Sequence, residues 1–239
     1  MKEWVGWFRK ASPYINTQRD QVMVLALSGD ALNHFNLDNI IHDIALLNSL
    51  GIRLVIVFGA RPQIEAALSK QGIQSKFHRR LRVTDLSMMP YVLEAYGRLR
   101  SELEAKLSMG IINSPMHGAK LNVVSSNFVM AKPHGVSDGV DLGLTGHVRS
   151  IDVASITHHL ENNSVVLMPS TGYSMTGDIF NLSYEELAGD VAIHLNASKL
   201  VFFGDDNGLK DQNGRLLKQV TVDQASSYTE AIDIEFSGP

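Results

Sequence analysis

Two short, uninterrupted apolar runs constrain the fold of this chain more than any other feature. The runs VMVLAL (22–27) and RLVIVF (53–58) lack polar–apolar alternation, which is typical of strands buried on both faces of a sheet. A segment with helical spacing lies between them, and a second opens at Pro62, whose fixed φ suits a helix start. Strand–helix–strand units of this kind form parallel sheets with helices on both faces.

The same alternation continues along the chain. Helices are expected at 37–50, 62–71, 87–109, 152–162 and 183–197, and further buried strands at 164–169 and 199–203. Asp152 is expected to cap one helix, and Ser183 with Glu186 matches a capping box. The sequence therefore predicts one α/β domain, a three-layer sandwich with a mainly parallel central sheet.

Two regions of the sequence predict turns rather than crossover helices. Residues 119–150 hold short apolar runs separated by Gly, Ser and Asp, which indicates hairpins at an edge or rim of the sheet. The stretch DQNGR (211–215) is a strong hairpin-turn signal.

Composition excludes several classes of function. A net charge of -4 and a pI near 6.1 give no reason to expect nucleic acid or an anionic membrane as a partner. The absence of cysteine excludes disulfides, thiolate catalysis and cysteine-ligated zinc, and the nine histidines show no metal-binding spacing, so no metal is expected. The N-terminus is interrupted by charges, unlike a signal peptide, and no apolar run is long enough to span a bilayer. A cytoplasmic protein is expected.

Residues 1–19 form a distinct N-terminal segment. Both tryptophans lie here, and the apolar positions 4, 7, 8, 11 and 15 share one helical face, which Pro13 is expected to kink or interrupt. The helix could pack on its own domain, or its aromatic residues could anchor it on another subunit. The residues that would form such an interface are Trp4, Trp7, Phe8 and Tyr14.

The ends of the predicted strands carry the candidate binding residues. In an open parallel sheet, ligands bind beyond the carboxyl ends of the strands. Glycines follow the strands within 28–30, 59–61, 169–172 and 204–206, which favours a small-molecule site there. The alternative is that these glycines only serve tight turns between strand and helix.

Several motifs resemble a known family. LLNSLGIRLVIVFGARPQI, LRVTD, VVSSNFVMAKPHGVSDGVD and LVFFGDDNGL together resemble the amino-acid-kinase-like domain of bacterial N-acetylglutamate synthase, which is built like N-acetylglutamate kinase. The resemblance covers residues 10–222 and implies the amino-acid-kinase (carbamate-kinase-like) fold. It divides the chain into an N-terminal helical interface segment (1–19) and an amino-acid-kinase-like domain (20–239). In the family, acetyl-CoA is used by a further acetyltransferase domain, so this chain itself is expected to bind no cofactor and to lack a catalytic residue.

The resemblance implies that the kinase chemistry has been lost. The position of the kinases' first phosphate-holding lysine is Ala26, and the position of their aspartate is Glu185. A further kinase lysine would fall beyond residue 239. The turns that hold phosphate in the kinases are degenerate here, at Ser28, Gly29, Asp30, Gly59, Ala60 and Arg61. Because phosphoryl transfer depends on cations and bare backbone N–H groups, a regulatory and assembly domain is expected.

Other positions match the family's ligand-binding residues. Arg82 corresponds to the arginine that grips the amino acid's carboxylate, and Asn181 to a residue that hydrogen-bonds the same ligand. N-acetylglutamate or glutamate could therefore bind a vestigial pocket; the alternative is that Arg82 forms a surface ion pair. Tyr14 matches a tyrosine beside the effector L-arginine, in relatives whose N-terminal helices join dimers into a hexamer. Two alternatives stay open: an active N-acetylglutamate kinase or other amino-acid kinase, and a ligand-free oligomerisation module.

Overall fold

The computed structural model describes residues 2–109, 121–204, 211, 215–221 and 224–225 of the chain. The chain separates into two compact units, residues 1–204 and 205–239. The elements below belong to the first unit. Among the described residues, no helix is both long enough and apolar enough to cross a membrane.

A five-stranded parallel sheet forms the centre of the first unit. Its strands are β1 (Val22–Leu27), β2 (Arg53–Phe58), β5 (Asn122–Val124), β10 (Ser164–Pro169) and β13 (Lys199–Phe203). They lie in the order β13-β1-β2-β10-β5, and each pairs with its neighbours in parallel. The two apolar runs therefore form adjacent strands with the predicted bounds.

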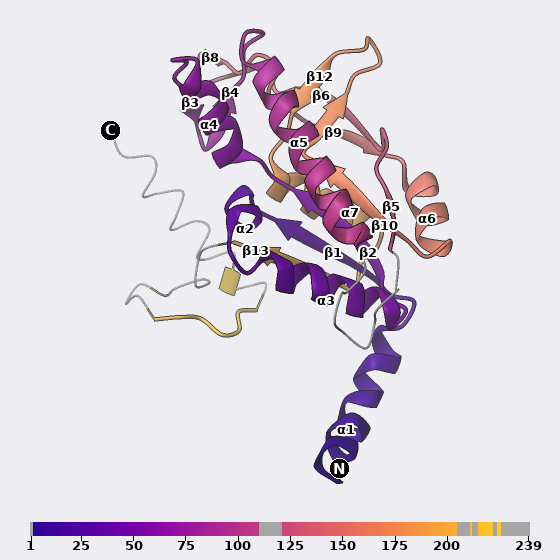
Figure 1. Ribbon diagram of the computed structural model, residues 1–239. Coiled ribbons are helices and arrows are strands. Elements are labelled where there is room, and N and C mark those ends of the chain that lie inside the picture. Colours follow the sequence, from indigo (N-terminus) through magenta and orange to yellow (C-terminus); the bar gives the residue numbers. More distant parts are fainter. Residues whose placement is uncertain (1, 110–120, 205–210, 212–214, 222–223, 226–239) are drawn as a thin grey trace. The chain divides into compact units, whose positions relative to one another are not determined.

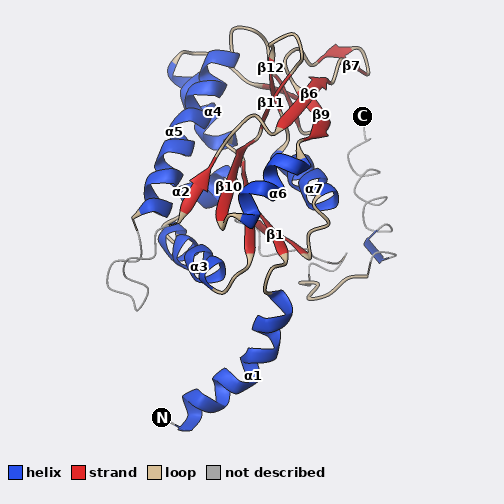
Figure 2. Ribbon diagram, turned by 90° about the vertical axis from the view of Figure 1, so that its right-hand side faces the viewer, coloured by secondary structure: helices blue, strands red, loops and turns tan. Residues whose placement is uncertain are grey.

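Helices cover both faces of this sheet and make three layers (Figures 1 and 2). On one face pack α3 (Leu37–Ser49), α4 (Arg61–Lys70) and α5 (Met89–Ser108), together with the short α2 (Gly29–Asn33). On the other face pack α6 (Val153–Glu161) and α7 (Tyr184–His194). The α/β three-layer sandwich predicted from the sequence is confirmed.

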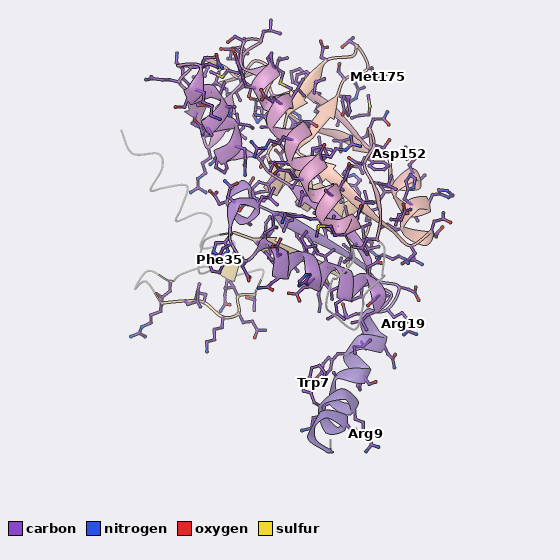
Figure 3. The ribbon with its side chains drawn as sticks, viewed as in Figure 1. Trp7, Arg9, Arg19, Phe35, Asp152 and Met175 are labelled. Carbon is purple, nitrogen blue, oxygen red and sulfur yellow. The ribbon has the colours of Figure 1, made fainter. Side chains whose placement is uncertain are left out.

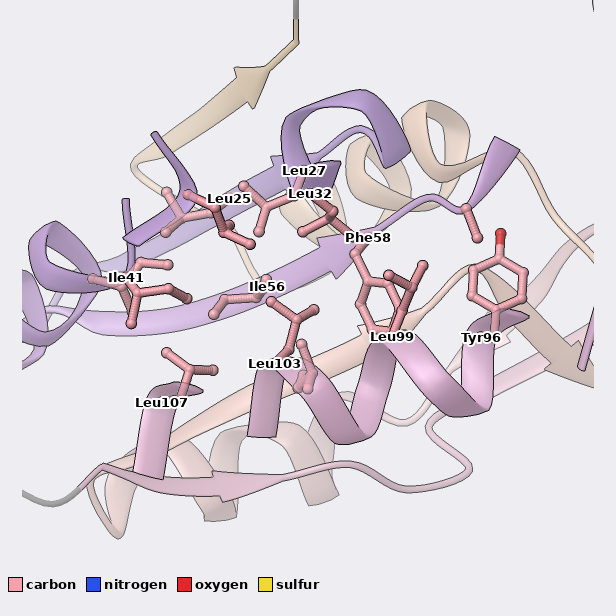
Figure 4. Packing of buried hydrophobic residues seen from close by; sticks show 14 of the residues in the cluster. Leu25, Leu27, Leu32, Ile41, Ile56, Phe58, Tyr96, Leu99, Leu103 and Leu107 are labelled. Carbon is pink, nitrogen blue, oxygen red and sulfur yellow. The ribbon is translucent and has the colours of Figure 1, made fainter. Parts of the chain in front are cut away.

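Alternate residues of each central strand supply the two cores. Leu25 and Leu27 point toward α3 and α5, whereas Val24 and Ala26 point toward α6 and α7. Figure 4 shows Tyr96, Leu99, Leu103 and Leu107 along the inner face of α5, with Phe58 of β2 packed against them. The caps were also predicted correctly, because Asp152 accepts the N–H of Ser155 (3.0 Å) and Ser183 accepts that of Glu186 (3.2 Å).

A second, smaller sheet lies beyond the carboxyl ends of the central strands. It consists of β12 (Ile179–Asn181), β11 (Thr171–Tyr173), β6 (Val129–Pro133) and β9 (Gly146–Ile151), in that order. Two ribbons accompany it, β3 (Lys76–His78) with β4 (Leu81–Val83), and β7 (Val136–Ser137) with β8 (Val140–Asp141). The hairpin-like middle region is thus antiparallel in β6–β9, but its first strand, β5, pairs in parallel with β10 in the central sheet.

The strand predicted at 199–203 exists, but its burial was predicted wrongly. Phe202 is 51% exposed, and neighbouring residues of β13 are only partly buried. The reason is position, because β13 pairs with β1 on one side and lies at the edge of the central sheet among the described residues. An apolar sequence does not distinguish an edge strand from a central one.

The N-terminal segment forms one helix, α1 (Lys2–Gln18), which includes Pro13. Trp7 is 64% exposed and Tyr14 is 76% exposed, and Figure 3 shows Trp7 pointing away from the helix. The side chains of Trp4 and Phe8 lie outside the described residues. The turn predicted at 211–215 lies mostly outside them as well. Its described hydrogen bonds include one from the N–H of Asp211 to the carbonyl of Arg215 (2.8 Å) and one from the N–H of Arg215 to Oδ1 of Asp211 (2.8 Å).

Candidate functional site

The predicted strand-end residues come together at the carboxyl edge of the central sheet. Leu27 lies opposite both Phe58 and Phe203, and Pro169 lies opposite Phe58, so the four strands end at one level. The residues that follow these strands therefore face one region, as expected for a parallel sheet. Their immediate surroundings decide whether a ligand could reach the backbone.

The turn after β1 is closed by the start of helix α4. Ser28 caps α2, because its Oγ accepts the N–H of Ala31 at 3.0 Å, and Asp30 in the first turn is exposed. A Cβ atom at Gly29 would lie 2.5 Å from Cδ of Pro62 and 2.6 Å from Oε1 of Gln63. Gly29 is required here by close packing within the protein.

The turn after β2 is covered by an aromatic ring. A Cβ atom at Gly59 would lie 2.8 Å from Cδ1 of Tyr184, the first residue of α7. In a phosphate-binding turn, a glycine allows the backbone to approach the ligand closely. At Gly59 the side chain of Tyr184 takes that space.

The backbone amide of Ala60 also faces a buried side chain. The hydroxyl of Tyr96 lies close enough to this amide and to the side chain of Ser170 for both to lower the pKa of Tyr96. The hydroxyl of Ser170 in turn donates to the carbonyl of Phe58 at 2.8 Å. Tyr96, Ala60 and Ser170 come from α5, the β2–α4 turn and the end of β10. One buried hydroxyl therefore contacts groups from two other elements.

The electrostatic surroundings of Tyr96 tie it to two predicted site residues. Burial raises the pKa of Tyr96 well above its usual value, and the contact with the side chain of Ser170 opposes this shift. The charge of Arg82 also lowers this pKa, whereas the charge of Glu185 raises it. Tyr96 therefore lies within electrostatic range of both residues.

Arg82 is buried and forms an ion pair with an acidic residue of the same protein. Its side chain is 4% exposed, and its Nη1 donates to Oε1 of Glu65 at 2.6 Å and to Oγ of Ser75. Its guanidinium also lies over the ring of Phe77, 4.9 Å from the centroid. The guanidinium of Arg61 lies 5.1 Å from the centroid of the same ring. Arg82 thus forms an ion pair in which its own side chain is buried and that of Glu65 is partly exposed.

Arg82 and Asn181 are linked by a buried polar network. The hydroxyl of Thr145 donates to the carbonyl of Arg82 and lies 3.0 Å from the hydroxyl of Thr84. Nδ2 of Asn181 donates to the same Thr84 hydroxyl at 3.1 Å. The network therefore joins Asn181 to the backbone carbonyl of Arg82, whereas the guanidinium of Arg82 is bound to Glu65 and Ser75.

Other predicted residues lie apart from this network. Ala26 is fully buried among apolar residues beneath α7, and Glu185 is exposed and accepts from the hydroxyl of Ser183 at 2.7 Å. Tyr14 and Trp7 are on α1, which leads into the amino end of β1, whereas the turns follow its carboxyl end. In the described parts of the chain, no three His, Asp or Glu residues gather as metal ligands would.

Sequence reasoning did not identify Tyr96, Glu65 or Phe77 as site residues. Tyr96 has the helical spacing of a core residue, with Val92, Leu99 and Leu103 on the same face of α5. Glu65 lies six residues after Gly59 on α4, and Phe77 lies five residues before Arg82. The only signal in the sequence was the proximity of Glu65 and Phe77 to recognised motifs.

A three-layer α/β domain with two phosphate-type turns at one edge of its parallel sheet defines an amino-acid-kinase-like domain. The amino acid kinase family matches residues 21–237, and the chain belongs to this family.

Its similar relatives are amino-acid acetyltransferases. The chain is 46% identical over 238 residues to that of Azotobacter vinelandii and 47% identical over 232 residues to that of Pseudomonas fluorescens strain SBW25. These alignments cover 100% and 97% of this chain but only 55% and 54% of the relatives. The chain therefore spans about half the length of the relatives it matches.

Solved structures give the same assignment. N-acetylglutamate synthase from Neisseria gonorrhoeae, complexed with coenzyme A and L-arginine, matches with a TM-score of 0.88 and 34% identity over 95% of this chain and 53% of that one. The same protein with coenzyme A and N-acetyl-glutamate matches with a TM-score of 0.85. Carbamate kinase from Giardia lamblia, at 14% identity and a TM-score of 0.62, shares the fold. The resemblance to the synthase's kinase-like domain and the expected fold are confirmed.

Proposed function

We propose that this chain is the regulatory and assembly domain of an N-acetylglutamate synthase. Such an enzyme makes N-acetyl-L-glutamate from acetyl-CoA and L-glutamate, the first step of arginine biosynthesis. The relatives that match the whole chain are named amino-acid acetyltransferases, and the chain spans about half of them. We expect acetyl transfer to be catalysed by the part of these relatives that lies outside their alignment with this chain. By itself, the chain catalyses neither acetyl nor phosphoryl transfer.

The occupied phosphate turns carry the second half of this proposal. The Tyr184 ring lies against Gly59, Pro62 lies against Gly29, and the Tyr96 hydroxyl lies beside the amide of Ala60. Phosphoryl transfer needs cations and free backbone donors around the phosphates. A nucleotide would have to displace packed side chains to reach these donors, and Ala26 supplies no cation.

A regulatory role is supported by the ligands of similar structures and by the buried network. The Neisseria gonorrhoeae synthase has been solved with L-arginine and with N-acetyl-glutamate. In this chain Arg82 and Asn181 keep the residue types that recognise a carboxylate and an amide. We therefore propose N-acetylglutamate or glutamate as a ligand at Arg82, and L-arginine as an effector near Tyr14.

A titration calorimetry experiment tests the loss of kinase function. The chain is titrated with magnesium-ATP in the presence of N-acetyl-L-glutamate, and ADP formation is measured on the same sample. We expect neither saturable heat nor ADP, while an active N-acetylglutamate kinase gives both in parallel. Saturable nucleotide binding with ADP production would replace the proposal with the kinase alternative, and acetyl transfer by this chain would contradict the rest of it.

A further inference from the structure

The ion pair between Arg82 and Glu65 is asymmetric in burial. The two atoms Nη1 and Oε1 are 2.6 Å apart, but the Arg82 side chain is 4% exposed and that of Glu65 is 42% exposed. Glu65 lies on α4, at the surface, whereas Arg82 lies on β4 beneath the ring of Phe77. One partner of the pair thus has access to water and the other does not.

Arg82 is held in place by contacts that do not involve Glu65. Its carbonyl accepts from Thr145, its Nη1 also donates to Ser75, and its guanidinium stacks on Phe77. Glu65 can rotate into water and be hydrated there, but the guanidinium of Arg82 would stay buried without a counter-ion. A buried charge left without its partner is strongly unfavourable, so another carboxylate would be drawn to it.

The surroundings of Phe77 carry more positive than negative charge. Arg61 stacks on the same ring as Arg82, and its Nη2 donates to the carbonyl of Arg80 at 2.7 Å. Neither of these partners of Arg61 carries a charge. Two guanidinium groups therefore meet at Phe77, with the Glu65 carboxylate bound to one of them, and this arrangement favours an additional or replacement anion.

We propose that the carboxylate of Glu65 competes with small carboxylate ligands for the guanidinium of Arg82 and thereby lowers the affinity of this pocket. The idea rests on the proposed function in one respect, that a carboxylate ligand binds at Arg82. In the exchange, one carboxylate replaces another, so the buried guanidinium keeps a counter-ion in both states. The occupant that suits the site is a small dicarboxylate or N-acyl amino acid.

Calorimetric titration of the 239-residue chain with N-acetyl-L-glutamate tests the competition. The variant Glu65→Gln keeps the length of the side chain and an acceptor oxygen but removes the competing charge. We expect the Kd to fall about tenfold or more relative to the wild type, because the ligand then supplies the only full counter-charge to Arg82. A neutral analogue, with both carboxylates converted to amides, should show no gain from the substitution.

A matched control removes a carboxylate from an exposed ion pair. Glu102 accepts from Nε of Arg98 at 2.7 Å on the outer face of α5, where both side chains are exposed. Glu102→Gln should leave the Kd unchanged, since exposed ion pairs contribute little and Glu102 is paired with Arg98 rather than with Arg82. If Glu65→Gln does not fold, Glu65→Asp is measured instead, because its shorter side chain withdraws the charge from Arg82 and should also tighten binding.

The possible outcomes distinguish the proposed ligand pocket at Arg82 from the proposed competition by Glu65. Equal Kd values for the wild type and Glu65→Gln would overturn the competition and leave the ligand pocket standing. If neither protein bound the ligand, both the pocket at Arg82 and the competition would be wrong. Tighter binding by Glu65→Gln that is absent with the neutral analogue supports both.

Discussion

The hydroxyl of Tyr96 on helix α5 lies beside the backbone N–H of Ala60, in the turn after strand β2, and this contact lowers the pKa of Tyr96. The residue at this position in a phosphate-binding turn would present its amide to the ligand. Here a side chain from another element lies against that amide and also contacts Ser170, whose hydroxyl donates to the carbonyl of Phe58. A turn of the phosphate-binding type has thus become a connection between helix and sheet.

The first prediction is that Tyr96→Phe destabilises the protein without leaving a cavity of any size. The substitution removes the hydroxyl that lies beside the buried amide of Ala60, so this amide loses its polar neighbour, whereas Ser170 keeps its bond to the carbonyl of Phe58. A buried unsatisfied group costs about 1–3 kcal/mol, which chemical denaturation would measure as a lower free energy of unfolding. Tyr14→Phe, at an exposed position, is the control and should change this free energy by less than about 0.5 kcal/mol.

The raised pKa of Tyr96 predicts a loss of stability at alkaline pH. Burial raises this pKa in the folded state, so the folded state holds the proton more tightly than the unfolded one. The stabilisation is complete below the unfolded pKa of about 10 and declines as the pH rises above it. The free energy of unfolding, measured by denaturation between pH 8 and 11 (roughly the range that spans this pKa), should fall more steeply with pH for the wild type than for Tyr96→Phe. Parallel curves would show that Tyr96 ionises equally in both states.

Much of this fold follows from local sequence patterns, whereas the closing of the turns does not. The strands at 22–27 and 53–58 and the caps Asp152 and Ser183 depend on neighbouring residues, and the structure has them as predicted. The pairing of Tyr96 with Ala60 joins positions 36 residues apart (96 minus 60), which a helical periodicity cannot reveal.

The site residues show the same division. The resemblance assigned Arg82 and Asn181 to one pocket, which stays a prediction, and the network through Thr84 and Thr145 joins Asn181 to the backbone carbonyl of Arg82. It gave no indication that Glu65 would bind Arg82, because that contact depends on how α4 packs against β4. The exposure of Phe202 was missed for a similar reason, since the order of strands in a sheet is a tertiary property.

A pair of glycine substitutions should have effects of opposite sign. In Gly29→Ala the new Cβ would lie 2.5 Å from Cδ of Pro62, so the start of α4 must shift, at a cost of about 1–3 kcal/mol. Gly97, within α5, has nothing within 4 Å of its would-be Cβ. Gly97→Ala should therefore stabilise the protein by about 0.5–1 kcal/mol through helix propensity alone.

Thermal and chemical denaturation of the two variants measure this difference. Adding Pro62→Ala to Gly29→Ala removes the ring atoms that the new Cβ meets and should recover part of the lost stability. If Gly29→Ala were as stable as the wild type, the turn after β1 would have room beside Gly29, and its closure by α4 would be refuted.

The exposed aromatic residues of α1 predict a role in assembly. Trp7 is 64% exposed and Tyr14 is 76% exposed on a helix that precedes the first strand of the central sheet. Large exposed aromatic side chains are typical of interface anchors, because they bury much apolar area when a partner covers them. Deleting residues 1–19 should therefore reduce the molar mass of the assembly measured by light scattering.

Phe35→Ala, which removes an aromatic side chain that is 91% exposed elsewhere in the first unit, should leave the mass per assembly essentially unchanged. An unchanged assembly after the deletion would refute the interface role of α1, and a change with Phe35→Ala would show that assembly uses another surface.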